Sequence, residues 1–137
     1  MSQSQEVFKL DHFELYNLAR QFRQRVYALI KQLPAEERYS LGSQMRGAIL
    51  SVTNNIAEGH GRWHYQENIQ FCRISRGSIE EILDDINLCL DEGYGDPGYN
   101  AQLKTEGYEL IRRINGYIVY LRKVKRGVTD DTLNQSS

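Results

Sequence analysis

Residues 39–57 read YSLGSQMRGAILSVTNNIA, a segment with one charged residue, Arg46, in a chain that is 26% charged. Apolar side chains recur along it at steps of three and four residues, the spacing of one face of an α-helix. These side chains are Leu41, Met45, Ala48, Val52 and Ile56. The opposite face, where lysine and glutamate usually stand, carries Arg46, Leu50, Thr53 and Ala57. A helix that is nearly uncharged on every side is usually buried on every side.

The rest of the chain shows the same helical spacing in three further stretches and nowhere the alternation of a strand. We expect helices over residues 12–33, 36–58, 64–92 and 98–126. Pro34 is expected to end the first helix or to open the second, and Gly59 is expected to close the second as a left-handed cap. Short connections favour antiparallel neighbours, so the sequence predicts an all-α, up-down-up-down four-helix bundle. It forms one domain over residues 1–127, and the polar residues 128–137 are expected to be a disordered tail.

The uncharged outer face of the second helix predicts assembly. Each helix of a four-helix bundle turns one side outward, and no residues remain to build a further layer in the same chain. We therefore expect another subunit to cover Arg46, Leu50, Thr53 and Ala57, giving a homo-oligomer. The alternative is a weakly polar helix that is simply exposed.

Charge is distributed in blocks, although the net charge is only −1. Residues 77–109 hold nine acidic groups and one basic group, whereas residues 110–127 hold six basic groups and no acid. Opposed blocks of this kind predict distinct positive and negative surfaces. The acidic third helix could face the basic fourth helix of a neighbour, head to tail, an arrangement that closes into a ring when the rotation permits. The alternative is that both faces are solvated.

The sequence carries no pattern of an enzyme, a metal site or a cofactor site. Gly59-His60-Gly61 lacks the third glycine, the Lys-Ser/Thr pair and the preceding strand of a phosphate loop. No Glu-x-x-His pair is present, which excludes the di-iron bundle proteins. Cys72 and Cys89 lie too far apart on one helix to pair and are expected to be buried thiols. With neither a signal peptide nor a membrane-length apolar run, we expect a cytoplasmic protein without membrane partners.

Basic and aromatic residues on the fourth helix suggest nucleic-acid binding. Arg112, Lys123 and Arg126 project away from the core near Tyr120, with Arg113 on the flank. Arg20 and Arg23 of the first helix could extend this patch. Basic side chains bind phosphates, and interleaved aromatic rings stack on exposed bases. The alternative is a solvated basic helix end, and the isoelectric point near 6.3 argues against strong non-specific binding.

Two segments together resemble a known family. ERYSLGSQMRGAILSVTNNIAEGHGR and the later FCRISRGSIEEILDDI are similar to the four-helix bundle protein family first named for reading frames in 23S rRNA intervening sequences. The resemblance covers about residues 13–125 and implies a bundle that assembles into a pentameric ring. It also implies kinship with the accessory protein of diversity-generating retroelements, which works beside a reverse transcriptase and its RNA. For most members no activity is established.

The family motif is matched at several positions around the end of the second helix. We expect the matching side chains to satisfy backbone groups where that helix ends and the chain turns. A ligand site at this corner is the alternative. Two positions depart from the family pattern: Gly47 replaces a frequent second arginine, and His64 replaces a serine of a capping box. The matching residues are Gln44, Arg46, Asn55, Glu58, Gly59, Gly61 and Arg62.

Two functions are therefore expected from the sequence. The first is a non-enzymatic ring that binds RNA or DNA, as an accessory to a reverse transcriptase. The second is a scaffold that binds proteins and ignores nucleic acid.

Overall fold

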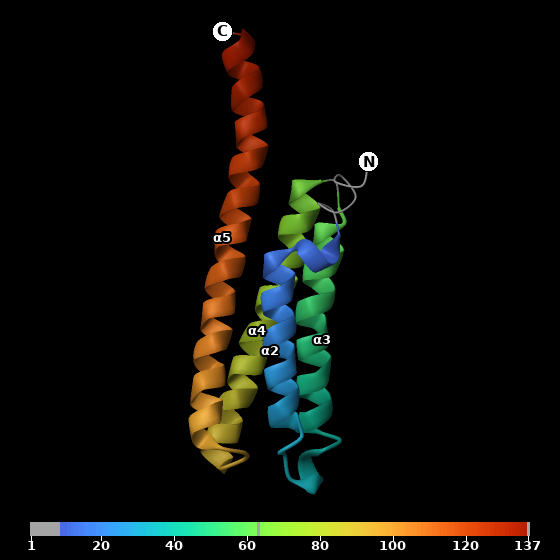
Figure 1. The fold of residues 1–137 in the computed structure, drawn as a ribbon, viewed down its shortest axis with the longest axis vertical. Coiled ribbons are helices and arrows are strands. Elements are labelled where there is room, and N and C mark those ends of the chain that lie inside the picture. The colour runs from blue at the N-terminus through green and yellow to red at the C-terminus, as the bar shows by residue number, and fades with distance from the viewer. Residues whose placement is uncertain (1–8, 63, 137) are drawn as a thin grey trace.

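The chain folds into four long helices joined by short turns (Figure 1). The computed structural model describes residues 9–62 and 64–136, with side chains described up to residue 124. Arg126 and the expected tail at residues 128–137 lie outside the described side chains. No strand is present in the described residues, and none of the helices there is long and apolar enough to cross a membrane. The elements are η1 (Leu10–His12), α2 (Glu14–Ile30), η2 (Ala35–Glu37), α3 (Leu41–His60), α4 (Tyr65–Glu92) and α5 (Pro97–Ser136).

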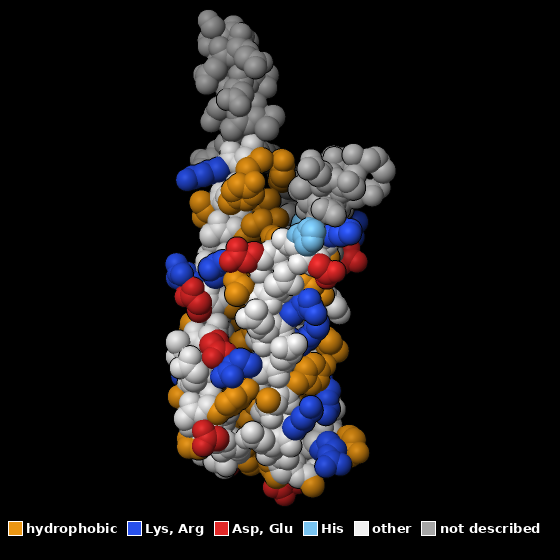
Figure 2. All heavy atoms as spheres, viewed as in Figure 1, with side chains coloured by type: hydrophobic (Ala, Val, Ile, Leu, Met, Phe, Trp, Pro, Cys, Tyr) orange, Lys and Arg blue, Asp and Glu red, His pale blue; other side chains and the backbone are white. Residues whose placement is uncertain are grey.

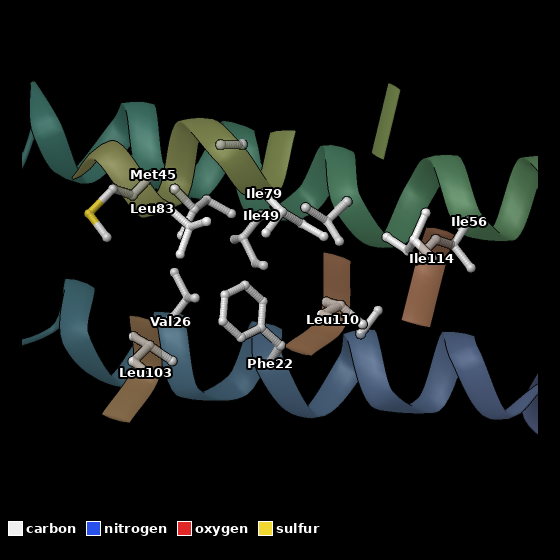
Figure 3. Close-up of a cluster of buried hydrophobic side chains, with 14 of the residues drawn as sticks. Phe22, Val26, Met45, Ile49, Ile56, Ile79, Leu83, Leu103, Leu110 and Ile114 are labelled. Atoms are coloured by element: carbon white, nitrogen blue, oxygen red, sulfur yellow. The ribbon is translucent and has the colours of Figure 1, made fainter. Parts of the chain in front are cut away.

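The core is formed by the apolar stripe of each helix (Figure 3). Phe22 and Val26 of α2 point towards Ile49 of α3 and Ile79 of α4, and all four are at most 4% exposed. Burying a side chain of this size stabilises the fold by about 1.5–3 kcal/mol relative to leaving it in water. Cys72 and Cys89 are buried free thiols, as expected, and burial raises the pKa of each to about 11. Neither is therefore a thiolate at neutral pH.

The second helix begins at Leu41 rather than near residue 36. Pro34 is extended, with φ −63° and ψ 155°, and the residues after it form only the short 3₁₀ turn η2. The Glu37 carboxylate accepts hydrogen bonds from the Ser40 hydroxyl at 2.7 Å and from the Tyr94 hydroxyl at 2.9 Å. These bonds hold the turn, so the chain enters α3 only after Ser40.

Gly59 is not the left-handed cap that the sequence analysis expected. It lies inside α3, and the glycines of the described residues with positive φ are Gly93 and Gly95. Gly93, at φ 72°, ends α4 in the left-handed conformation. A Cβ atom on Gly59 would lie 2.5 Å from Oδ1 of Asn68 and 3.1 Å from Cβ of Phe71. The glycine is needed because α3 and α4 approach closely at this point.

Polar contacts between α3 and α4 fix how the two helices are aligned. The Gln44 amide donates to Asp85 Oδ1 at 2.8 Å near the start of α3, and the Ser78 hydroxyl donates to Ser51 Oγ at 2.8 Å further along. The hydroxyl of Ser75 donates to the backbone oxygen of Val52 at 2.9 Å. Gln44 thus lies beside Asp85, while Ser51 and Val52 lie beside Ser78 and Ser75.

Candidate nucleic-acid and subunit interfaces

An exposed tyrosine on α5 stacks on a tyrosine that is fixed in place. The rings of Tyr117 and Tyr120 lie 6.1 Å apart at an interplanar angle of 22°. The Tyr117 hydroxyl accepts a 3.0 Å hydrogen bond from the Asn68 amide, and burial raises the pKa of this phenol above its ordinary value. Tyr120 remains 57% exposed. A ring held in this way presents a flat aromatic surface on which a base can stack.

The aromatic cluster continues inward and ties three helices together. Phe13, just before α2, lies 5.1 Å from the Tyr117 ring and stacks at 4.5 Å on His60 of α3. His60 is therefore half-buried. Its Nε2 atom is buried and finds no hydrogen-bond partner among the described side chains. The sequence analysis missed this stack because Phe13 and His60 are far apart in the chain.

The basic residues of α5 differ in how far they are neutralised. Arg112 makes two hydrogen bonds to Glu109, at 2.9 and 2.6 Å, which raise the pKa of the guanidinium. Arg113 donates to Glu14 of α2 at 2.8 Å. Lys123 is exposed, and none of the ion pairs among the described side chains involves it. Phosphate contact is therefore easier near Tyr120 and Lys123 than near Arg112.

Arg20 and Arg23 of α2, which the sequence analysis added to the patch, do not join this group. Arg23 donates to the Thr53 hydroxyl at 3.0 Å, so it lies on the side of α2 that faces α3. Arg20 is one turn away, over the Tyr16 ring at 5.8 Å, whereas Arg113 contacts the other side of α2 through Glu14. The predicted patch is thus divided between two faces of the molecule. Figure 2 shows basic and apolar side chains interleaved over α2 and α3, with acidic ones towards the two ends of that face.

Three of the four residues predicted to form a subunit interface lie at the surface of α3. Arg46 and Leu50 are exposed, Leu50 by 39%, and Ala57 is half-buried. Thr53 was wrongly placed on this face: it is 1% exposed and packs against α2, where it accepts the hydrogen bond from Arg23. The sequence analysis did not include three further exposed residues of this face, Ser43, Gly47 and Asn54.

The family-motif residues at the end of α3 make local contacts. Glu58 pairs with Arg62 at 2.9 Å, and the Arg62 guanidinium lies over the Phe71 ring at 5.2 Å, at the start of α4. Asn55 donates to the backbone oxygen of Ser51 at 2.7 Å. Gly61 is the C-terminal cap of α3 with helical dihedral angles. This corner is thus held mainly by contacts between side chains; the backbone group that Asn55 bonds, the oxygen of Ser51, lies inside α3 and not at its end, where the sequence analysis expected such bonds.

An acidic groove at the other end of α3 contains a buried carboxylate. Asp85 is 3% exposed; its Oδ1 accepts from Gln44, and its Oδ2 has no partner among the described side chains. Burial first, and then the neighbouring charges of Asp84 and Glu81, raise the pKa of Asp85 to about 6. The described residues contain no group of His, Cys, Asp and Glu side chains placed to hold a metal ion. The groove is lined by Glu37, Ser40, Leu41, Gln44, Asp84, Asp85, Asn87, Leu88 and Asp91.

Comparison with known families gives one match. Residues 11–116 match the family model described as 23S rRNA-intervening sequence protein. The matched region runs from η1 to the middle of α5 and includes α3, α4 and the groove. No curated protein matches the chain.

Proposed function

Because the chain belongs to the 23S rRNA-intervening sequence protein family, we propose that it is a non-enzymatic RNA-binding protein whose copies assemble into a ring. Nucleic acid, RNA or an RNA/DNA hybrid, binds along α5 around Tyr120 and Lys123. Consecutive helices run antiparallel, a proposal supported by the hydrogen bonds that pair the start of α3 with the end of α4.

The observation that carries the proposal is the stacked tyrosine pair beside an unneutralised lysine. Tyr117 is fixed by Asn68, so Tyr120 loses little conformational freedom when a base stacks on it. Lys123 lies about one helical turn further along α5 and can bind the adjacent phosphate. One such site is weak, but copies repeated around a ring raise the overall affinity through multivalency.

A protein scaffold that ignores nucleic acid is the second candidate. It is favoured by the ion pairs of Arg112 and Arg113, which reduce the positive potential over the middle of α5. Resemblance to retroelement accessory proteins makes a reverse transcriptase the partner to test first in either case. Co-purification of the two proteins with and without ribonuclease distinguishes a protein contact from one bridged by RNA.

Nucleic-acid binding is tested with the double variant Tyr120→Ala/Lys123→Glu. We expect it to bind single-stranded RNA at least about tenfold more weakly than the wild type, because it loses one stacking contact and one phosphate contact. Fluorescence anisotropy titrations at several salt concentrations measure this. The slope of log affinity against log salt should also fall by about 0.7 per lost phosphate contact and site.

Lys104→Glu is the matched control, since it makes the same charge change on the same helix but far from Tyr120. It should keep most of the affinity. Equal losses in both variants would mean that only net charge matters. Wild-type protein that binds no RNA at low salt would favour the scaffold.

A further inference from the structure

The alignment of α3 and α4 makes it possible to compare their outer faces level by level. Gln44 lies opposite Asp85 and Ser51 opposite Ser78, and both helices rise about 1.5 Å per residue. Arg46 is therefore level with the turn that contains Asp84. By the same alignment, Leu50 is level with the region around Ile79, and Glu58 is level with the turn that contains Arg73.

The outer face of α3 changes character along its length. Near the groove it begins with the exposed cation Arg46, followed by Gly47 and the exposed Leu50. Its middle is uncharged, and its far end carries the carboxylate of Glu58, which is already paired with Arg62, so the charge that is free to meet a neighbour is that of Arg46. Among the described side chains no ion pair involves Arg46, and it is not used by the proposed RNA site.

The outer face of α4 has the opposite order at the same levels. Near the groove it carries the exposed carboxylates of Glu81 and Asp84. Its middle contains Gly77 and Ile74, which is 45% exposed, and beyond them lies the exposed cation Arg73. When two copies lie side by side and point the same way, the charge at each end of one face meets the opposite charge on the other. Complementarity of this kind fixes both register and direction.

Two glycines supply an observation that is independent of charge. Gly47 on α3 and Gly77 on α4 are exposed, and a Cβ atom added to either would have nothing within 4 Å. A glycine inside a helix costs about 0.5–1 kcal/mol relative to alanine. At Gly59 and Gly107 an added Cβ atom would lie only 2.5 Å and 2.8 Å from a neighbouring side chain, so packing within the chain requires glycine there. Packing within the chain makes no such demand at Gly47, Gly77 or Gly116, but Gly47 and Gly77 lie on the two complementary faces, where close approach of another helix would require glycine.

One of the two oxygens of the buried Asp85 carboxylate also lacks a partner at this level of the molecule, although the other accepts from Gln44. The Oδ2 atom of Asp85 is buried, lies in the acidic groove and accepts no hydrogen bond from the described side chains. An unpaired buried acceptor is costly, and a charge-assisted bond from a guanidinium removes that cost. Arg46 is exposed and lies level with this groove. It stands on the outer face of α3, whose order of charges is complementary to that of α4.

We infer that the outer face of α3 in one copy packs on the outer face of α4 in the next, both pointing the same way, with Arg46 entering the groove beside Asp84 and Asp85. This inference rests on the proposed assembly and identifies its two faces. Each copy uses a different surface towards each neighbour. The contact is therefore heterologous. Both faces of every copy are covered only when the row of copies closes into a ring.

A charge swap tests the assignment. Sedimentation velocity of Arg46→Glu and of Asp84→Arg should each show mostly protomers, with association weakened at least about tenfold by repulsion across the contact. The double variant Arg46→Glu/Asp84→Arg should associate more strongly than either single variant, because residues 46 and 84 again carry opposite charges, but more weakly than the wild type, because the carboxylates of Glu81 and Asp85 remain. Lys104→Glu, the same charge change on α5, should keep the wild-type mass. Circular dichroism checks that each variant is folded.

Two results would overturn the assignment: folded single variants that assemble like the wild type, or a folded double variant that associates no better than the two single variants. In both cases, if the wild type sediments at a mass above that of one chain, the proposal of a ring stands and only the assignment of these two faces is rejected. A wild type that sediments as a protomer rejects the ring itself.

The glycines provide a second test with a matched control. Gly77→Leu should weaken assembly strongly, because the side chain fills the space that the neighbouring helix needs. Gly116→Leu should not, although Gly116 is equally open on α5, with nothing within 4 Å. Equal masses for the two variants would contradict a close approach at α4.

Discussion

Alanine in place of Gly59 is expected to destabilise the fold by about 2 kcal/mol, even though alanine favours helices. The new Cβ would lie 2.5 Å from Asn68 Oδ1 and 3.2 Å from the backbone oxygen of the same residue. Asn68 cannot move aside freely, because its amide donates to Tyr117 and its Oδ1 lies 3.7 Å from the Cys72 sulfur. Urea unfolding followed by circular dichroism measures the loss.

Gly116→Ala is the control for this substitution. Gly116 lies inside α5, outside the proposed contact, and has no neighbour within 4 Å, so helix propensity alone should stabilise the protein by about 0.5–1 kcal/mol. Opposite signs for the two alanines would confirm the close approach of α3 and α4 at Gly59. A stabilising effect at both positions would show that the helices are further apart there.

Acidification is expected to dissociate the assembly through Asp85. Its pKa is raised to about 6 in the free copy, and a guanidinium from a neighbour would lower that pKa in the assembled copy. The free copy then binds the proton more tightly, so lower pH favours dissociation. Near pH 5 the association constant should be about tenfold smaller per contact than near pH 7.5. Sedimentation velocity at the two pH values measures this.

The titration of the other acidic groups around Asp85 must be distinguished from that of Asp85 itself. Glu81, Asp84 and Asp91 lie on α4 and Glu37 on η2, while α3 contributes the uncharged Gln44. The control is therefore Asp85→Asn, which should assemble more weakly near pH 7.5 and show little change between about pH 7.5 and 5. An unchanged pH profile in this variant would assign the titration to a different carboxylate.

The effect of pH has the opposite sign for the folding stability of a copy that cannot assemble: acidification weakens association but stabilises the fold through Asp85. In Arg46→Glu, the folded state should bind a proton at Asp85 more tightly than the unfolded chain does, because burial raises its pKa in the fold. The free energy of unfolding contributed by Asp85 is then highest below the ordinary pKa of aspartate. It falls as the pH rises from about 4 to about 6.

The fold could be predicted from the sequence because each helix repeats its apolar residues at helical spacing. Leu41, Met45, Val52 and Ile56 are all at most 5% exposed, in agreement with the prediction. The ends of the helices were less predictable. The start of α3 depends on bonds from Ser40 and Tyr94 to Glu37, and Tyr94 is distant in sequence. Gly59 has the residue type of a cap, but helix packing determines its role.

The candidate sites were predictable only in part, because they depend on which neighbour each helix faces. Arg20 and Arg113 seemed to share a patch, yet α2 turns one side to α3 and the other to α5. Thr53 lies at the boundary between the outer face and the contact with α2, and the angular position of a residue on one helix cannot resolve that boundary. Asp85 resembled its exposed acidic neighbours in sequence; only packing against Gln44 distinguishes it.

The mass of the wild-type protein in solution, measured by light scattering at micromolar concentration, tests most directly whether copies of this chain cover one another's outer helices. We expect a single species at a multiple of the 15.9 kDa chain mass. A species at the mass of one chain would show that α3 is stable with its uncharged face in water, and would contradict the ring and the contact proposed at Arg46.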